Sequence, residues 1–224
     1  MKGKLFAAFL IVFLLGLDST VFAQKEQTPF WDEIQAFKKQ DSIQPQPQHA
    51  ILFVGSSSFT KWKDVQDYFP GYPIINRGFG GSSLPDVIRY ADDVIFPYNP
   101  KQVVIYCGDN DLAASDTVTA QIVFERFKIL FSMIRGNFKG ISIAYISIKP
   151  SPSRQKLMPK MLQANTLIKA FLKKKKNTAF IDVYQKMLTA DGQPIDSLFI
   201  EDKLHMNKDG YAIWQKEIQP YLLK

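Results

Sequence analysis

The 224-residue chain contains few of the residues that cross-link a fold or bind metal: one cysteine and two histidines. A single thiol cannot form an intramolecular disulfide, so the fold must depend on its own core. Cys107 ends the apolar run Val103–Tyr106, and we expect it to be a small buried residue. Two distant histidines and one cysteine make no zinc-type ligand cluster. The sequence therefore implies neither a metal nor another cofactor.

Phosphate-binding motifs are also missing. No Gly-Lys-Ser/Thr occurs, and the glycine-rich stretch Gly78–Gly81 is followed by Ser83, where a dinucleotide loop would need glycine. No internal repeat is visible. A hydrophobic fraction of 46% and a charged fraction of 22% are typical of a globular protein, and the length fits one domain.

Positive charge is in excess, with a formal net charge of +7. Much of that excess lies in Lys173–Lys176, which follows an apolar-periodic helical segment. Cations are favoured near a helix C-terminus and are solvated there, so we expect no nucleic-acid partner. Attraction to an anionic surface or polysaccharide stays open.

The N-terminal segment resembles a secretory signal. Lys2 and Lys4 precede the apolar stretch Leu5–Leu15, and small residues lead to Val21-Phe22-Ala23. We predict a signal peptide over residues 1–23 with cleavage before Gln24, which makes the protein secreted or periplasmic without stable membrane insertion afterwards. An uncleaved membrane anchor is the alternative. Lipid anchoring is not expected, because the cleavage site has no cysteine.

Residues 24–49 are predicted to form an amphipathic helix and a linker. Thr28-Pro29 is a plausible helix start, and Phe30, Ile34 and Phe37 recur at helical spacing. The Pro/Gln-rich stretch 44–48 favours an extended connection, and the helix is expected to pack on the outside of the main domain, residues 50–224.

Apolar strands alternate with helical patterns through that domain. Such alternation predicts a three-layer α/β/α fold with a five-stranded parallel sheet. The predicted strands are Ile51–Val54, Pro73–Ile75, Val103–Tyr106, Ile141–Ile148 and Ala179–Ile181, and helices include Leu84–Ile95 and the terminal segment.

Four short polar clusters each follow a predicted segment of this sheet. Because the carboxyl ends of parallel strands open into one crevice, these clusters are expected to converge. Together they supply a hydroxyl, an imidazole, a carboxylate and amide donors, which suits acyl transfer through a serine. The clusters are Gly55–Ser58, Asn76–Gly81, Gly108–Asp111 and Asp202–His205.

Each cluster taken alone also has a plain structural explanation. The serines can cap the helix that begins near Phe59, and the glycines can form a turn. Asn110 and its neighbours suit a turn equally well. Asp202 stands three residues before His205, which fits a carboxylate that orients a base, whereas His49 is expected to be a surface residue.

The four clusters, in this order, resemble those of an SGNH hydrolase of the GDSL esterase/lipase superfamily, over residues from Ile51 to the terminal helix. The resemblance implies that Ser57 is the nucleophile, His205 the general base and Asp202 its orienting acid. It also implies an oxyanion hole formed by the Ser57 N–H, the Gly81 N–H and the Asn110 side chain. Asn76 is expected to shape the second cluster's loop.

One departure loosens the alignment, because Gly55-Ser56-Ser57 stands where the family has Gly-Asp-Ser. Ser56 or Ser58 therefore stays an alternative nucleophile. An α/β-hydrolase is excluded, since Phe59 replaces the second glycine of Gly-x-Ser-x-Gly and the serine follows the first core strand.

The resemblance implies hydrolysis of short acyl oxygen esters, acetyl esters above all, on a small-molecule or oligosaccharide substrate. Phe59, Trp62 or Phe79 would serve as sugar platforms if exposed, although such aromatics more often pack in the core. A lysophospholipase or platelet-activating-factor-acetylhydrolase-like lipid esterase is a second possibility. A non-catalytic carbohydrate-binding protein with this fold is the third. Arg77 and Lys149, near strand ends, have no assigned role.

Overall fold

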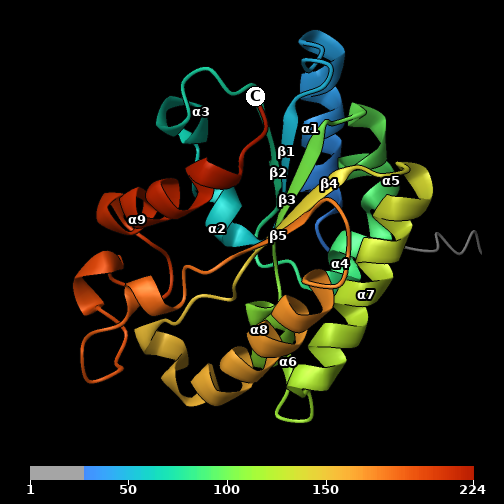
Figure 1. Cartoon of the computed structure of the whole chain (residues 1–224). Coiled ribbons are helices and arrows are strands. Elements are labelled where there is room, and N and C mark those ends of the chain that lie inside the picture. Colours follow the sequence, from blue (N-terminus) through green and yellow to red (C-terminus); the bar gives the residue numbers. More distant parts are fainter. Residues whose placement is uncertain (1–27) are drawn as a thin grey trace, which may run out of the picture.

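The computed structural model describes residues 28–224, and its centre is a five-stranded sheet in the order β2-β1-β3-β4-β5 (Figure 1). Every neighbouring pair of strands is parallel, which confirms the predicted fold class. The predicted signal peptide lies outside the described residues. The strands are β1 (Ile51–Gly55), β2 (Ile74–Gly78), β3 (Gln102–Tyr106), β4 (Ser142–Ile146) and β5 (Thr178–Ile181).

Helices cover both faces of the sheet and produce three layers (Figure 1). One face carries α1 (Trp31–Ile43), α4 (Leu84–Arg89), α5 (Ala91–Val94), α7 (Ala120–Asn137) and α8 (Met158–Leu172). The other carries α2 (Ser57–Thr60), α3 (Val65–Tyr68) and α9 (Lys208–Ile218). The short helix α6 (Asp109–Ala114) and the 3₁₀ helix η2 (Pro152–Leu157) stand at the carboxyl edge.

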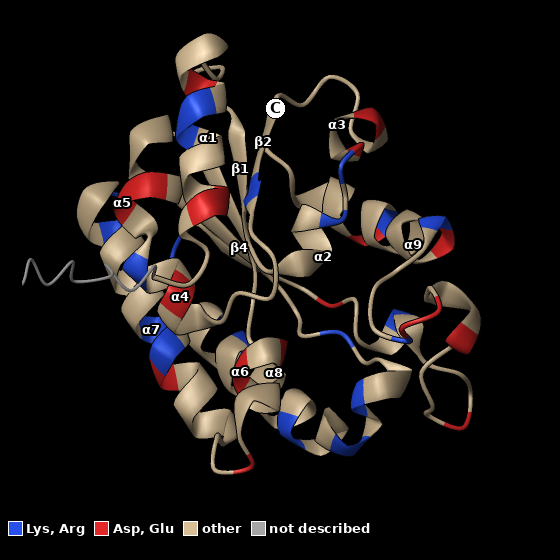
Figure 2. Cartoon of the chain, turned by 180° about the vertical axis from the view of Figure 1, so that it is seen from behind, with Lys and Arg blue, Asp and Glu red and all other residues tan. Residues whose placement is uncertain are grey.

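The strands are apolar throughout because both faces are buried. Leu52 and Val54 of β1 point into the core beneath α4 and α7, whereas Ile51 and Phe53 point toward α3 and α9. All four side chains are completely buried. Charged residues lie mainly on the helices and loops around the sheet (Figure 2).

Two helix predictions were wrong in their bounds. The segment predicted as one helix, Leu84–Ile95, is broken at Tyr90 into α4 and α5, where the Tyr90 hydroxyl donates to the Pro29 carbonyl at 2.7 Å. The first helix starts at Trp31 rather than at Pro29, because Phe30 has a left-handed backbone with φ of 68°.

Of the two interpretations of the aromatics near the site, packing in the core is correct and the sugar platform is wrong. Phe59, Trp62 and Phe79 have no exposed surface. Trp62 stacks on Tyr211 with ring centroids 4.7 Å apart, and Phe79 packs edge-on against Phe30. The chain after β1 lies directly on the sheet, so its large side chains are needed to cover the strands.

The strand order creates a switch point between β1 and β3. After β1 the chain turns to α2 on one face, and after β3 it turns to α6 and α7 on the other. Connections that diverge in this way leave a crevice at the carboxyl ends of the two strands. The predicted serine and asparagine clusters follow these two strands. No helix within residues 28–224 is both long enough and apolar enough to span a membrane.

Candidate active site

A sharp turn after β1 presents Ser57. Gly55 has φ of 142°, and a side chain there would place its Cβ 1.8 Å from the Tyr106 carbonyl oxygen, so only glycine fits. The Ser56 N–H donates to that same carbonyl at 3.0 Å. Ser57 is then the first residue of α2, where a backbone N–H has no acceptor inside the helix. The turn therefore offers both a hydroxyl and an amide at one point.

The glycine-rich loop after β2 is tied to the same turn. The Gly55 carbonyl accepts hydrogen bonds from the Phe79 N–H and the Ser82 hydroxyl, both at 3.0 Å. Gly81 lies between these two anchors with φ of 70° and open space where a side chain would be. The loop is also held from outside, because the Gly80 N–H donates to a Glu33 carboxylate oxygen of α1 at 2.8 Å.

Asn76 connects this loop to α2, as its side-chain amide donates to the Phe59 carbonyl at 2.8 Å and accepts from the Gly78 N–H at 3.0 Å. The expectation that Asn76 shapes the second cluster is therefore met by its contacts. Arg77 points elsewhere: it is buried and pairs with Asp41 of α1 and with the Tyr98 hydroxyl. That cluster fastens α1 to the sheet.

Asn110 reaches the glycine-rich loop from α6. Its side-chain N–H donates to the Ser82 carbonyl at 3.0 Å. Its side-chain oxygen accepts from Arg154 of η2 at 2.8 Å, and the same guanidinium donates to an Asp109 carboxylate oxygen at 2.9 Å. Two contacts therefore fix the orientation of the Asn110 amide.

His205 connects the serine turn to the Asp202 loop. Its Nε2 lies 2.8 Å from the Ser57 Oγ, and its Nδ1 lies 2.6 Å from an Asp202 carboxylate oxygen. An ionised carboxylate only accepts, so Nδ1 carries the ring proton and Nε2 accepts from the serine hydroxyl. The neighbouring serines are placed differently, since Ser56 and Ser58 are buried.

Asp202 is held in its ionised form. Burial opposes ionisation, but the hydrogen bonds from the His205 ring and from the backbone N–H groups of His205 and Leu204 prevail. They lower the pKa of Asp202 to about 2. The same backbone N–H groups lie 2.8 and 2.9 Å from its second oxygen, which fixes the turn.

The segment after β4 holds the loop that carries His205 through two hydrogen bonds to its backbone. Lys149 is 1% exposed and donates to the Leu204 carbonyl at 2.9 Å, while the Ser153 N–H donates to the Lys203 carbonyl at 3.0 Å. Burial lowers the pKa of Lys149 to about 8, with Asp109 and Asp202 opposing that effect. Lys149 is therefore a buried cation close to the site.

The structure thus gathers the predicted side chains at the β1–β3 switch point. Ser57, His205 and Asp202 are joined by direct hydrogen bonds, and Asn110 contacts the loop that carries Gly81. His49 is exposed and Cys107 is buried, as expected. Asn207 caps α9 through its side chain.

Sequence reasoning missed Arg154 and Glu33. Arg154 follows the carboxyl end of β4, so the strand-end rule would have included it. Glu33 belongs to a helix that precedes the sheet, and nothing in the sequence indicates its contact with Gly80. Within residues 28–224 no group of three or more His, Cys, Asp or Glu side chains is placed to hold a metal ion.

Solved structures share this architecture. A structure from Streptococcus pneumoniae named for platelet activating factor superposes with a TM-score of 0.74 at 19% identity, over 86% of this chain and 92% of its own. A Bacteroides fragilis acylhydrolase gives a TM-score of 0.73 at 22% identity, covering 85% and 95%. A variant of a Geobacillus acetyl-xylooligosaccharide esterase gives 0.60 at 15% identity, covering 80% and 96%. These likenesses show the fold.

A search of curated protein sequences finds no match. The family comparison is decisive instead, since the GDSL-like Lipase/Acylhydrolase family model matches residues 41–213. This span contains all four polar clusters and confirms the resemblance seen in the sequence. The chain therefore belongs to the GDSL-like lipase/acylhydrolase family and is a carboxylic ester hydrolase.

Proposed function

We propose that Ser57, His205 and Asp202 form a catalytic triad that hydrolyses oxygen esters through an acyl-serine intermediate. The observation that carries this proposal is the continuous contact from the Ser57 Oγ through both ring nitrogens of His205 to Asp202. His205 Nε2 takes the serine proton during attack on the carbonyl carbon and returns it to the leaving alcohol. A water molecule then repeats the sequence on the acyl-enzyme.

The tetrahedral oxyanion is assigned to three donors: the N–H of Ser57, the N–H of Gly81 and the side-chain amide of Asn110. The Asn110 nitrogen carries two hydrogens, and its bond to the Ser82 carbonyl occupies one. Donors fixed before the reaction stabilise the developing charge at no cost in reorganisation. Arg154 supports this arrangement, since it holds the Asn110 oxygen.

A short acyl group, acetyl above all, on a carbohydrate alcohol is the proposed substrate. The segments after β1, β2 and β3 each reach the next helix within a few residues, so in the described part of the chain they build no separate lid over Ser57. A groove of about 610 Å³, lined in part by the Arg154 that holds the Asn110 oxygen, has polar and charged walls as well as apolar ones. Its lining includes Leu112, Ala113, Arg154, Lys156 and Leu157.

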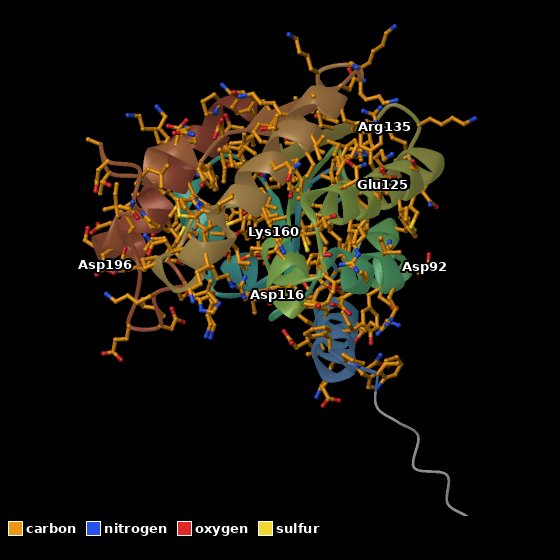
Figure 3. The ribbon with its side chains drawn as sticks, turned by 90° about the horizontal axis from the view of Figure 1, so that it is seen from below. Asp92, Asp116, Glu125, Arg135, Lys160 and Asp196 are labelled. Carbon is orange, nitrogen blue, oxygen red and sulfur yellow. The ribbon has the colours of Figure 1, made fainter. Side chains whose placement is uncertain are left out.

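A lysine of α8 holds the part of the groove wall that contains Asp116. Lys160 donates to the carbonyl oxygens of Asp116 at 2.8 Å and of Val118 at 3.1 Å (Figure 3). A mixed, firmly held wall of this kind suits a polar alcohol group better than a long acyl chain. The Geobacillus structure named as an acetyl-xylooligosaccharide esterase has the same fold, which is consistent with this assignment.

A lipid ester is the second candidate. It is favoured by the Streptococcus pneumoniae structure named for platelet activating factor, which superposes with the higher TM-score of 0.74. Rates on nitrophenyl acetate, butyrate and octanoate, together with acetate release from acetylated xylan, separate the two. Acetate release with a steep fall toward octanoate supports the carbohydrate ester, whereas a preference for octanoate supports the lipid ester.

Ser57→Ala tests the triad itself. The substitution removes the nucleophile, so turnover should fall to the background rate while the melting temperature stays nearly unchanged. Ser56→Ala and Ser58→Ala are matched controls on the same turn and should retain most activity. Full esterase activity in Ser57→Ala would refute the assignment, and absence of turnover in the wild-type chain would favour a binding protein.

We further propose that the protein acts outside the cytoplasm, secreted or in the periplasm. The proposal is supported by Lys2, Lys4 and the apolar stretch that follows them in the sequence. N-terminal sequencing of the protein recovered from culture medium or periplasm should begin at Gln24. Recovery of the full-length chain from the membrane fraction would contradict it.

A further inference from the structure

The ammonium group of Lys149 is buried against the loop that carries His205. The Lys149 Nζ donates to the Leu204 carbonyl at 2.9 Å and lies 5.7 Å from the centre of the Phe199 ring. The whole residue is 1% exposed. Leu204 directly precedes His205, so this contact acts on the backbone that carries the imidazole.

The Asp202–His205 turn depends on such supports. Lys203 has a left-handed backbone with φ of 56°, which is unfavourable for a residue with a side chain. The surrounding chain holds the turn through the Ser153 N–H, which donates to the Lys203 carbonyl, and through a bridge between Phe199 and Met206. Among these supports Lys149 contributes a charged side chain.

For stability alone, a buried lysine is a poor choice. Transfer of an ammonium from water to the interior carries a large desolvation penalty, and apolar residues of similar volume often stabilise such sites. A methionine would fill the same space without that penalty. The charge of Lys149 therefore indicates a role other than packing.

We propose, on the basis of the proposed function, that Lys149 is a positioning residue for ester hydrolysis. Its ammonium binds the Leu204 carbonyl and so fixes the position of the His205 ring relative to Ser57. Small displacements of reacting groups cost large factors in rate, since proton transfer requires hydrogen-bond contact. The 2.8 Å contact between His205 Nε2 and the Ser57 Oγ depends on the position of this backbone.

Lys149→Met tests the proposal in the full chain, with nitrophenyl acetate as substrate. We expect kcat to fall about 10-fold or more, with KM changed less than kcat. The melting temperature should stay unchanged or rise, because a buried charge has been removed. Loss of a packing role alone would lower the melting temperature and would not lower kcat in the folded protein.

Lys149→Gln tests the donor contact directly and serves if the methionine variant does not fold. Glutamine keeps a donor for the Leu204 carbonyl without the charge, so it should recover part of kcat. The matched control is Lys169→Met, an exposed lysine of α8 that pairs with Asp182 away from the His205 loop. It should match the wild type in kcat.

Wild-type kcat in Lys149→Met would overturn the inference, and so would a kcat of Lys149→Gln no higher than that of Lys149→Met. So would a loss of kcat that merely follows the loss of folded protein measured by circular dichroism. These results differ from failure of the proposed function, which would appear as full activity in Ser57→Ala or as no activity in the wild type.

Discussion

Asp202→Asn is the sharpest test of how the His205 ring is oriented. The wild-type carboxylate accepts the ring Nδ1–H at 2.6 Å through one oxygen and two backbone N–H groups through the other. Asparagine can keep the two backbone bonds with its oxygen. Its nitrogen then faces Nδ1 and can only donate, so the ring must accept there and carry its proton on Nε2. That tautomer cannot take the proton of Ser57.

The expected loss in kcat is about 10³-fold, or ~4 kcal/mol of transition-state stabilisation, below the 10⁴-fold loss known for the corresponding change in a serine protease. We expect the smaller value because the Asp202 side chain is 43% exposed, and water moderates electrostatic effects. The folded state should survive, since the backbone bonds of the turn remain. Steady-state rates on nitrophenyl acetate at pH 7 to 8 measure the effect.

Asp202→Ala provides the comparison. Alanine leaves the imidazole free to choose its tautomer, so its loss of kcat should be smaller, about 10²-fold. A kcat of Asp202→Asn within about 3-fold of the wild type would refute this account of the ring. A kcat of Asp202→Ala below that of Asp202→Asn would refute it as well.

Stability should respond to acid in a defined direction. The pKa of Asp202 is about 2 in the fold and 3.8 ordinarily, so its ionised form stabilises the fold above pH 3.8. That contribution disappears as pH falls toward 2, and Asp202→Asn should lack it. A wild-type melting temperature that falls no faster than the variant's between those pH values would contradict the argument.

Three further substitutions address the proposed oxyanion donors and the serine turn. Asn110→Ala should lower kcat on the order of 100-fold with little change in KM, because it removes a donor that acts mainly in the transition state; an effect confined to KM would contradict this role. Arg154→Met should lower kcat about 10-fold by freeing the Asn110 amide, while Lys156→Met in the same groove should not; equal losses in both would indicate a general effect on the groove. Gly55→Ala should destabilise the fold by about 3 kcal/mol or more in urea denaturation, because its Cβ would lie 1.8 Å from a carbonyl oxygen. Gly136→Ala, in a helix with open space around it, is the control and should be neutral or stabilising; equal destabilisation of both would contradict the steric argument.

The sheet was predictable because its strands are short apolar runs between turn residues. Val103–Tyr106 and Ile51–Val54 lie within strands buried on both faces, and no helix of the required length fits there. The break at Tyr90 was not predictable: the residue leaves the helical region of the backbone, with ψ of 14°, and its hydroxyl contacts the Pro29 carbonyl, far away in the sequence. Local patterns carry no record of such contacts.

The site could be assembled from the sequence to the extent that its residues follow strand ends. This holds for Ser57 and Asn110, which follow β1 and β3. It was wrong for the Asp202–His205 cluster, which lies well past the end of the last strand at Ile181, although His205 does contact Ser57. The direction of the aromatic side chains could not be derived from the sequence, because α2 is only four residues long and shows no periodicity. The contacts of Arg154 and Lys149 likewise arise only when separate loops meet.

The contact between Glu33 and the Gly80 N–H changes how this enzyme should be produced and modified. A carboxylate on the helix before the sheet braces the loop that carries Gly81, and Arg77 with Asp41 fastens the same helix to β2. A recombinant protein trimmed to begin at Ala50 would retain every strand yet lose both braces. Expression designs should therefore retain residues 31–43, and fusion partners or immobilisation tags should not be attached within them.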